Sequence, residues 1–457
     1  MFRGTASRRS ASLPFGAGAL RTDTVTVQPP LPSPPDDPEA EFQQFVDRNL
    51  KRNFLAHFTH GMLGMTGFRL VYAPTFVPAY LSLLTGSPFM VGLGQSLQQA
   101  GAILSPVLGA QQIEHRRRIL PISILLGGLM RIQLLGLAIA GWFLADRSLV
   151  VATLIFLFLL GFFMGSQRVA FQVVLAKVIP IRRRGRLQAW RNLFGGGLAA
   201  GLSYWAGKTL IEEDWLGNGY ATTFALAFVL TSIGLAVIAR FMREPESPTV
   251  RTHMSLRERL SEFPALMKDR DYRNFLIAQL LTMSGRISIP FCILYAGETL
   301  GLSGSTVGLL SLAFLGADTV SNIIWGPLGD RFGFRLVYLI SVALWALSVL
   351  LLLAAESSLG FFTAFAGLGM ALSGYLMSQQ TMVLEFGSRD DVPMRLALST
   401  TVETSMATIG PLLGGAIVAY AGYQPVFYLT IACLVAALGV LLFAVREPRY
   451  RSPSASA

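Results

Sequence analysis

The stretch GPLGDRFGFRLV at residues 326–337 places an aspartate and an arginine between glycines, inside a strongly apolar part of the sequence. An earlier stretch, GAQQIEHRRR at residues 109–118, aligns with its beginning without gaps and shares the first glycine and the last arginine. Ile113 stands where the later copy has Asp330, so the earlier copy lacks the carboxylate. Two copies of one short polar segment indicate that the chain contains an internal duplication.

The sequence on both sides of these segments has the composition of a membrane protein. Of its 457 residues, 53% are hydrophobic and only 14% are charged. A bilayer core about 30 Å thick needs roughly 20 apolar residues in a helix, and we count twelve stretches of this length. They are too long for the strands of a membrane barrel, so the sequence predicts an all-α membrane protein with twelve transmembrane helices.

The predicted spans form two groups of six, separated by a charged segment. The tetrapeptide RNFL lies just before the first span and at the start of the seventh, which supports the duplication. The spans are 57–84, 89–110, 119–144, 149–178, 187–210 and 220–242, followed by 272–299, 306–328, 334–355, 359–386, 396–420 and 425–445. The expected units are therefore a tail at 1–53, a six-helix bundle at 54–243, a linker at 244–271, a second six-helix bundle at 272–447 and a tail at 448–457.

The formal net charge of +11 does not indicate nucleic-acid binding, because the basic residues follow the sides of the membrane. The connections after odd-numbered spans contain only Arg147 and Lys208, whereas those after even-numbered spans contain the basic runs at 116–118, 181–186 and 240–273. The positive-inside rule therefore predicts that both termini and the linker are cytoplasmic. We expect a multi-pass protein of the cell (inner) membrane.

The first fifty-three residues differ in composition from the rest, with PPLPSPPDDP at 29–38, and we expect them to be a disordered cytoplasmic tail. Residues 1–21 lack acids and are rich in Arg and Ser, as in a mitochondrial transit peptide. Pro14 and three glycines disfavour the amphipathic helix of such a peptide, so we interpret this segment as a basic tail. Cys292 and Cys433 lie inside predicted spans and indicate neither a disulfide nor a metal site.

Two sets of six spans, with G-x-L-x-D-R-x-G in a cytoplasmic connection, resemble the major facilitator superfamily from about residue 54 to residue 447. GPLLGG at 410–415 is similar to a glycine-proline pattern common in the eleventh span of that family. The sequence departs from the family pattern in two places: the copy at 109–118 is the degenerate one, and Phe334 occupies a position that is usually basic. The resemblance implies two bundles that open a central site alternately to the two sides of the membrane. It implies no particular substrate.

The segment at 326–337 then has the position of a gate. By the family's pattern, Asp330 faces the N-terminal end of the eleventh span, and Arg331 and Arg335 reach carboxylates, with Glu385 the nearest candidate. Such contacts would hold the cytoplasmic side closed and break when it opens. The alternative is that Asp330 caps the ninth span while Arg331 follows the positive-inside rule. The proposed gating residues, including the glycines that permit a tight turn, are Gly326, Asp330, Arg331, Gly333, Arg335 and Glu385.

Charged residues inside a membrane span cost several kcal/mol unless they face water or a partner, so each is a functional candidate. In the family, the first, fourth, seventh and tenth spans line the cavity, and Arg69, Arg168 and Arg286 lie on three of them. Because a guanidinium binds carboxylate or phosphate with two hydrogen bonds, we expect an anionic or strongly polar substrate. The alternative for each arginine is a buried carboxylate partner or a position at the surface. Helical spacing adds Tyr72, Gln172, Gln279, Tyr375 and Gln379 to the substrate-binding set.

Two carboxylates are candidates to carry protons. Asp318 shares one face of the eighth span with Asn322 and Trp325, and Glu403 lies in the eleventh span among threonines. We expect Asp318 to pair with Arg286 in the empty cavity, with Glu403 as the reserve. Arg131, on the third span, is interpreted as a structural contact between helices.

The sequence therefore predicts a secondary active transporter of a small organic solute that works by alternating access, with protons as the coupling ion. It contains no G-x-x-x-x-G-K-[ST] motif, no histidine pair at metal spacing and no nucleophile motif, so we expect no enzyme activity, cofactor or metal. We also expect a monomer in the lipid bilayer. Two alternatives stay open: a multidrug efflux antiporter for amphipathic compounds, with a surface that includes Phe162, Phe163, Met164 and Phe171, and a non-transporting or lipid-handling membrane protein.

Overall fold

A computed structural model of the protein describes residues 38–113, 116–246, 266–386 and 392–447, and every regular element in these ranges is a helix. The first half comprises α1 (Pro38–Tyr72), α2 (Phe76–Thr85), α3 (Pro88–Ile113), α4 (Leu120–Phe143), α5 (Asp146–Val178), α6 (Ile181–Trp205), η1 (Ala206–Ile211), η2 (Trp215–Gly217) and α7 (Gly219–Phe241). The second comprises α10 (Arg270–Met283), η3 (Ser284–Ile287), α11 (Ile289–Leu300), α12 (Gly304–Phe332), α13 (Phe334–Ala354), α14 (Ser358–Glu385), α15 (Val392–Ala421) and α16 (Tyr423–Phe443).

Nine helices within the described ranges are long and apolar enough to cross a membrane. They are α4, α5, α7, α10 continued by η3 and α11, and α12 to α16. The three other predicted spans coincide with α1–α2, α3 and α6–η1. The all-α membrane class is thereby confirmed, while the division into twelve spans stays a prediction.

Two helices are interrupted at equivalent places in the two halves. The first predicted span is divided between α1 and α2 at residues 73–75, and the seventh contains the 3₁₀ segment η3 between α10 and α11. Pro74, Pro78 and Pro290 lie beside these interruptions. Proline lacks the N–H that continues the helical ladder and its ring collides with the preceding turn, which accounts for the breaks.

The helix α1 begins much earlier than the sequence predicts. Residues 38–53, expected to be part of a disordered tail, are helical, and beyond Pro38 they contain no residue that breaks a helix. Arg52 Nε donates to the carbonyl of Phe241 at 2.6 Å, and the side-chain amide of Asn53 exchanges two hydrogen bonds of 2.9 Å with the backbone of Arg243. These contacts hold the extension against the end of α7, and they correct the expected boundary of the tail. The rest of the predicted tail, residues 1–37, lies outside the described residues.

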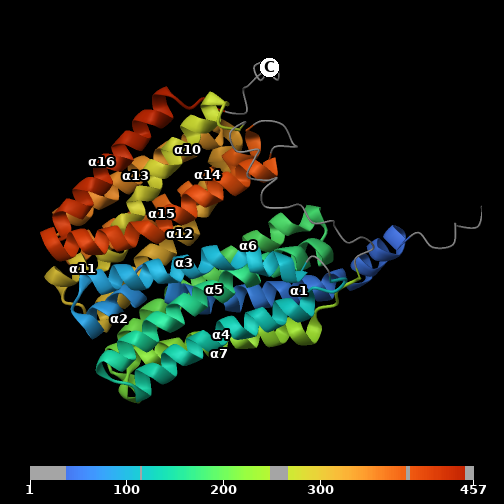
Figure 1. Ribbon diagram of the computed structural model, residues 1–457, viewed down its shortest axis with the longest axis horizontal. Coiled ribbons are helices and arrows are strands. Elements are labelled where there is room, and N and C mark those ends of the chain that lie inside the picture. Colours follow the sequence, from blue (N-terminus) through green and yellow to red (C-terminus); the bar gives the residue numbers. More distant parts are fainter. Residues whose placement is uncertain (1–37, 114–115, 247–265, 387–391, 448–457) are drawn as a thin grey trace, which may run out of the picture.

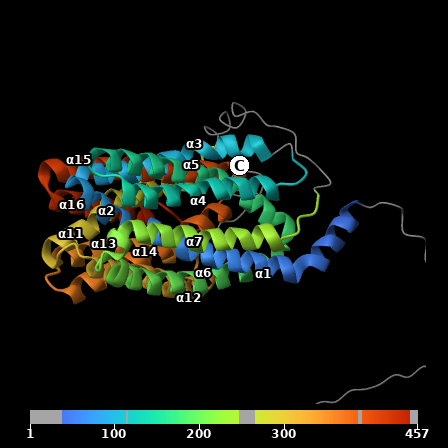
Figure 2. The same ribbon diagram turned by 90° about the horizontal axis from the view of Figure 1, so that it is seen from below.

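The two halves pack against each other along two helix pairs, α3 with α15 and α6–η1 with α12. Figure 2 shows the first pair along the upper side of the molecule and the second along the lower side. Small residues permit the close approach: a Cβ atom at Gly92 would overlap the carbonyl of Pro411, and one at Gly207 would overlap the backbone of Gly304 and Gly308.

These contacts gather at one end of the molecule, which we call the closed end and define by the connections at 86–87, 212–218, 301–303 and 422. The short helices α2 and α11 meet there (Figure 1). In addition, the backbone N–H of Ser305 donates to Glu212 Oε2 at 2.8 Å, so a carboxylate of the first half binds the N-terminus of α12 in the second. The halves are therefore joined by packing and by a charged contact at this end.

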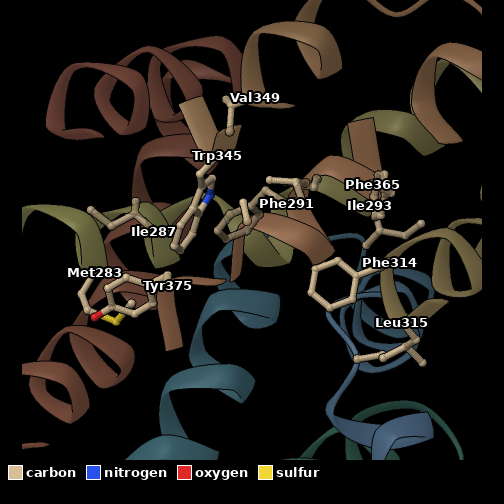
Figure 3. Close-up of a cluster of buried hydrophobic side chains, with 14 of the residues drawn as sticks. Met283, Ile287, Phe291, Ile293, Phe314, Leu315, Trp345, Val349, Phe365 and Tyr375 are labelled. Atoms are coloured by element: carbon tan, nitrogen blue, oxygen red, sulfur yellow. The ribbon is translucent and has the colours of Figure 1, made fainter. Parts of the chain in front are cut away.

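One buried apolar cluster runs through the second half and continues into the first. Figure 3 shows side chains of this core, among them Phe291 of α11, Trp345 of α13, and Phe365 and Tyr375 of α14. All four are buried, with 1% or less of their surface exposed. Because apolar side chains face apolar lipid outside as well, packing between helices, rather than exclusion of water, accounts for this core.

Candidate functional site

One ion pair inside the membrane region joins the two halves. Arg69, in the last turn of α1, places its NH1 2.7 Å from Oδ2 of Asp318, which lies midway along α12. The same NH1 donates to the hydroxyl of Thr319 at 3.2 Å. The side chains of Arg69 and Asp318 are 23% and 15% exposed, so water reaches both. The expected pairing of Asp318 with Arg286 is therefore wrong.

The break after α1 positions this ion pair. Thr75, in the break, forms a 2.6 Å hydrogen bond between its hydroxyl and that of Ser311, two turns before Asp318 on α12. Arg69 and Thr75 thus bind α12 at two positions about two turns apart, Thr319 and Ser311. This ion pair is stable only while both groups are charged. If one group loses its charge, the other stays partly buried without a partner, which costs free energy.

A second ion pair lies within the second half. Arg286 NH2, on η3, is 3.9 Å from Oε1 of Glu403 on α15, and the two side chains are 24% and 21% exposed. This is a longer contact than that of Arg69 with Asp318. The Nε of Arg286 is buried without a hydrogen-bond partner among the described residues. Arg286 therefore retains donor capacity.

Two of the three glutamines predicted to bind substrate, Gln279 and Gln379, are brought together, but inside the protein. Ser399 Oγ donates to Gln279 Oε1 at 2.9 Å and accepts from Gln379 Nε2 at 2.8 Å. All three residues are at most 2% exposed, so they connect α10, α14 and α15 rather than line an open surface. Sequence reasoning missed Ser399, although its position four residues before Glu403 places it on the same face of α15.

The predicted tyrosines are mostly core residues in this state. The ring of Tyr375 lies 5.3 Å from that of Tyr338 and 6.3 Å from that of Trp345, and the residue is fully buried. Tyr72 is partly buried, with its ring 6.2 Å from that of Phe68. The hydroxyls of Tyr375 and Tyr72 are both enclosed. Neither tyrosine therefore presents its hydroxyl to an open surface.

Arg168 and Gln172 are exposed on α5, and within the described ranges neither forms a hydrogen bond or an ion pair. Neither residue therefore takes part in the ion pair of Arg69 with Asp318 or in that of Arg286 with Glu403. Arg131 is the opposite case, because it is 2% exposed and its guanidinium donates to the carbonyls of Thr231 at 2.7 Å and Gly127 at 2.6 Å. The interpretation of Arg131 as a contact between helices is confirmed.

Residues 54–285 and 275–457 match the sequence family described as the Major Facilitator Superfamily, so that the match covers both halves. The chain belongs to the major facilitator superfamily. Membership of this family points to a transporter rather than an enzyme.

Named relatives match a shorter part of the chain. The multidrug resistance protein MdtG of Serratia proteamaculans (strain 568) is 32% identical over 165 residues, which are 35% of this chain and 39% of that protein. The protein of the same name from Yersinia enterocolitica is 33% identical over 165 residues, with the same coverage. The chain thus spans about two fifths of the length of these relatives.

Solved structures agree over most of both chains. A D-xylose-proton symporter has a TM-score of 0.67 at 15% identity, with 88% of this chain and 100% of that chain covered. A bacterial homologue of the iron transporter ferroportin in an inward-facing state has a TM-score of 0.62 at 14% identity, with 88% and 100% covered. At these identities the likeness shows the superfamily fold alone.

The superfamily motif at 326–335 is placed differently from our expectation. The helix α12 continues to Phe332, so Gly326 lies within a helix and the turn is made at Gly333, whose φ is +91°. Arg335 binds within the second half: its Nη2 donates to the carbonyls of Leu441 at 2.8 Å and Leu442 at 2.9 Å on α16. In this state Arg335 therefore ties α13 to α16 inside one half, and its role as a gating contact stays a prediction.

The other motif residues keep their predicted role as a hypothesis. Asp330 and Arg331 are exposed at the end of α12, and the guanidinium carbon of Arg331 lies 5.1 Å from the centre of the Phe332 ring. Glu385 is the last residue of α14 and is half-buried. Ile113 ends α3, while the neighbouring Glu114 lies outside the described residues.

A groove of about 830 Å³ lies between the α1 extension and the ends of α4 and α7, and its lining includes none of the residues Arg69, Asp318, Arg286 and Glu403. Its lining includes Phe42, Phe45, Arg117 and Arg243. Within it, Glu244 binds Lys177 at 2.7 Å and accepts the N–H groups of Ile119 and Leu120, which anchors the start of α4. The groove therefore belongs to the packing of the helix ends.

Proposed function

We propose that this protein is a proton-coupled secondary active transporter that moves a small organic solute by alternating access. The observation that carries the proposal is the ion pair of Arg69 with Asp318, which joins the two halves inside the membrane. Alternating access requires the halves to move relative to each other, and a contact between them must change during that movement. When the Asp318 carboxylate takes up a proton it loses its negative charge, which weakens its contact with Arg69.

The proposed topology has twelve spans, with α1–α2, α3 and α6–η1 added to the nine apolar helices. Both termini and the linker at 244–271 are cytoplasmic, because the basic residues of the connections gather on that side. The protein acts as a monomer in the cell (inner) membrane. The closed end then faces away from the cytoplasm, and the state described is one that opens inward.

Proton uptake by Asp318 is the proposed coupling step. While Asp318 is ionised, Arg69 holds the two halves together at mid-membrane. Protonation removes the charge on one partner, so the pair separates and the halves are released from each other at that height. Moving one elementary charge through 100 mV is worth about 2.3 kcal/mol, so one proton supports substantial solute accumulation. Glu403, which is more loosely held by Arg286, is the reserve proton carrier.

A second candidate function is efflux of amphipathic compounds. It is favoured by the named relatives, which are multidrug resistance proteins. It is also favoured by the charge of the central region, because Arg69 and Arg286 both have carboxylate partners and contribute no net positive charge. Of the aromatic residues predicted for such a surface, Phe162 and Phe163 contact each other edge to face at 5.5 Å and are partly buried.

Transport into liposomes tests the proposal. Purified protein is screened over organic anions and amphipathic cations, with and without a pH gradient. The wild type should accumulate a solute only when the gradient is present. Asp318→Asn should lose this accumulation but retain exchange of solute, whereas Glu356→Gln, a matched change in an exposed connection, should behave as wild type. Accumulation by the Asp318→Asn variant against a solute gradient would show that Asp318 is not the proton carrier.

A further inference from the structure

The membrane part of the first half contains arginines but no acid. Between Asp47 and Asp146 the only acidic residue is Glu114, and none lies between Asp146 and Glu212. Two of its arginines are satisfied, since Arg69 binds Asp318 and Arg131 binds backbone carbonyls. The remaining two, Arg168 and Arg191, have no carboxylate partner within the described ranges.

Arg191 is the more deeply placed of these two. It lies on α6 with its side chain against Gly61 of α1, where a Cβ atom would overlap the guanidinium. Its guanidinium carbon is 6.0 Å from the centre of the Phe171 ring on α5, and its NH1 donates to Gln188 Oε1 at 3.2 Å. Its Nε is buried without a hydrogen-bond partner in the described part of the chain. A guanidinium between three helices therefore retains unused donors.

A buried histidine beside Arg191 is also unsatisfied. His57, one turn before Gly61 on α1, is fully buried, and neither of its ring nitrogens has a hydrogen-bond partner among the described residues. Its ring lies 4.7 Å from that of Phe171. We call Arg191, His57 and Phe171 the Arg191 cluster. It offers a fixed positive charge, an imidazole and an aromatic face, contributed by α6, α1 and α5.

Unused donors of this kind are costly inside a protein, because a buried polar group that leaves water without a new partner loses free energy. An anion would satisfy them: a carboxylate or phosphate accepts from the guanidinium and from a neutral imidazole N–H at the same time. No side chain of the membrane part of this half supplies one, and no described carboxylate of the second half forms an ion pair with Arg191, so a bound solute can supply it.

We propose that the Arg191 cluster binds the anionic group of the transported solute, and that the solute is an amphipathic organic anion. This rests on the proposed function. Arg191 is ten residues from the start of α6 at Ile181, about 15 Å along the helix from the end proposed to be cytoplasmic. Phe171 provides a face for the apolar part of the solute. Arg168, three residues before Phe171 and exposed, adds positive charge one turn away.

The Arg191 cluster supplies a positive charge that the two central ion pairs, each with no net charge, do not supply. Arg69 and Arg286 are each held by a carboxylate, so neither offers a free charge to an arriving anion. Arg191 is not held in this way. Arg191 is accordingly the residue that determines the charge of the solute, while the pair of Arg69 with Asp318 couples the proton.

Binding of paired probes to the purified full-length protein tests this inference. Benzoate, 2-naphthoate and octanoate are compared with their uncharged amides by ligand-observed NMR, in the absence of any gradient. Wild type should bind the carboxylates about tenfold more tightly than the amides. Arg191→Gln should remove this preference, and Arg191→Lys should restore only part of it, because an ammonium lacks the two-pronged donor geometry. If the wild type binds each carboxylate and its amide with equal affinity, the proposal is overturned.

A second variant and its control keep the proposal testable if Arg191→Gln does not fold. Gly61→Ala moves the guanidinium without changing any charge, and Gly64→Ala is its control, because a Cβ at Gly64 meets no atom within 4 Å. Gly61→Ala should weaken carboxylate binding while Gly64→Ala leaves it unchanged; equal binding by both would contradict the proposal. Proton-driven accumulation is measured separately, so a failure of carboxylate preference and a failure of proton coupling are distinguishable.

Discussion

The guanidinium of Arg69 and the carboxylate of Asp318 lie 2.7 Å apart and belong to different halves of the molecule. The other central pair, Arg286 with Glu403, lies within one half at 3.9 Å. A rigid rotation of one half against the other leaves the second pair unchanged but has to alter the first. The two pairs are therefore not equivalent.

Exchanging the two charges tests this relationship. Arg69→Asp and Asp318→Arg each place two like charges together, and each should lower the free energy of unfolding by up to about 3 kcal/mol. The double variant restores an opposite pair and should recover a large part of the loss. Thermal unfolding in nanodiscs measures both effects. If the double variant loses the sum of the two single losses, the two side chains do not interact.

Enlarging a glycine at the closed end should open it. A Cβ at Gly92 meets the carbonyl of Pro411, which is backbone and cannot rotate away, so Gly92→Ala forces α3 and α15 apart. Spin labels at Leu216 and Glu356, one exposed position in each half, should show a longer distance distribution in this variant. Gly197→Ala is the control, since a Cβ there meets nothing within 4 Å. An unchanged distribution for Gly92→Ala would show that this contact does not keep the end closed.

The sequence locates charged residues within apolar runs, but it does not identify their partners in space. Arg69, Arg286, Asp318 and Glu403 each lie well within such a run, which predicts charges inside the membrane. Which arginine meets which carboxylate depends on how the helices are arranged laterally, and the apolar runs do not encode this. The assignment of Asp318 to Arg286 failed for that reason.

Two further residues show other limits. Gln279 and Gln379 were predicted to face the substrate, but the sequence does not reveal that Ser399 satisfies both amides inside the core. Sequence analysis did not single out Arg191, which lies five residues beyond the basic run at 181–186. The signal that identifies it is compositional: the membrane part of the first half has no acid to neutralise an arginine.

Removing the Ser399 hydroxyl should destabilise the second half. Ser399→Ala leaves Gln279 Oε1 and Gln379 Nε2 buried without this partner, at a cost of about 1–3 kcal/mol for each group that stays unpaired. Thermal unfolding of the variant measures the loss. Thr400→Val is the matched control, because Thr400 is exposed and bonds only to its own helix at Leu396. Equal stability of the two variants would mean that the glutamines find other partners.

The last prediction separates the two charged residues of the motif at 326–335. The contacts of Arg335 lie on α16 and at Glu447, all within one half, so Arg335→Gln should lower stability without changing how the halves are distributed between states. Asp330, exposed at the end of α12, is the residue that the superfamily resemblance assigns to the cytoplasmic latch. Asp330→Asn should therefore favour the inward-open state while stability changes little.

Spin labels at Arg186 on α6 and Leu384 on α14, both exposed, report the separation of the halves at the end proposed to be cytoplasmic. With Asp330→Asn the population at long distance should increase, because the negative charge that attracts the positive end of a neighbouring helix is lost. With Arg335→Gln the distribution should stay that of wild type while the melting temperature falls. A shift in the distance distribution for Arg335→Gln but not for Asp330→Asn would reverse these roles and leave Asp330 as a residue of the helix end.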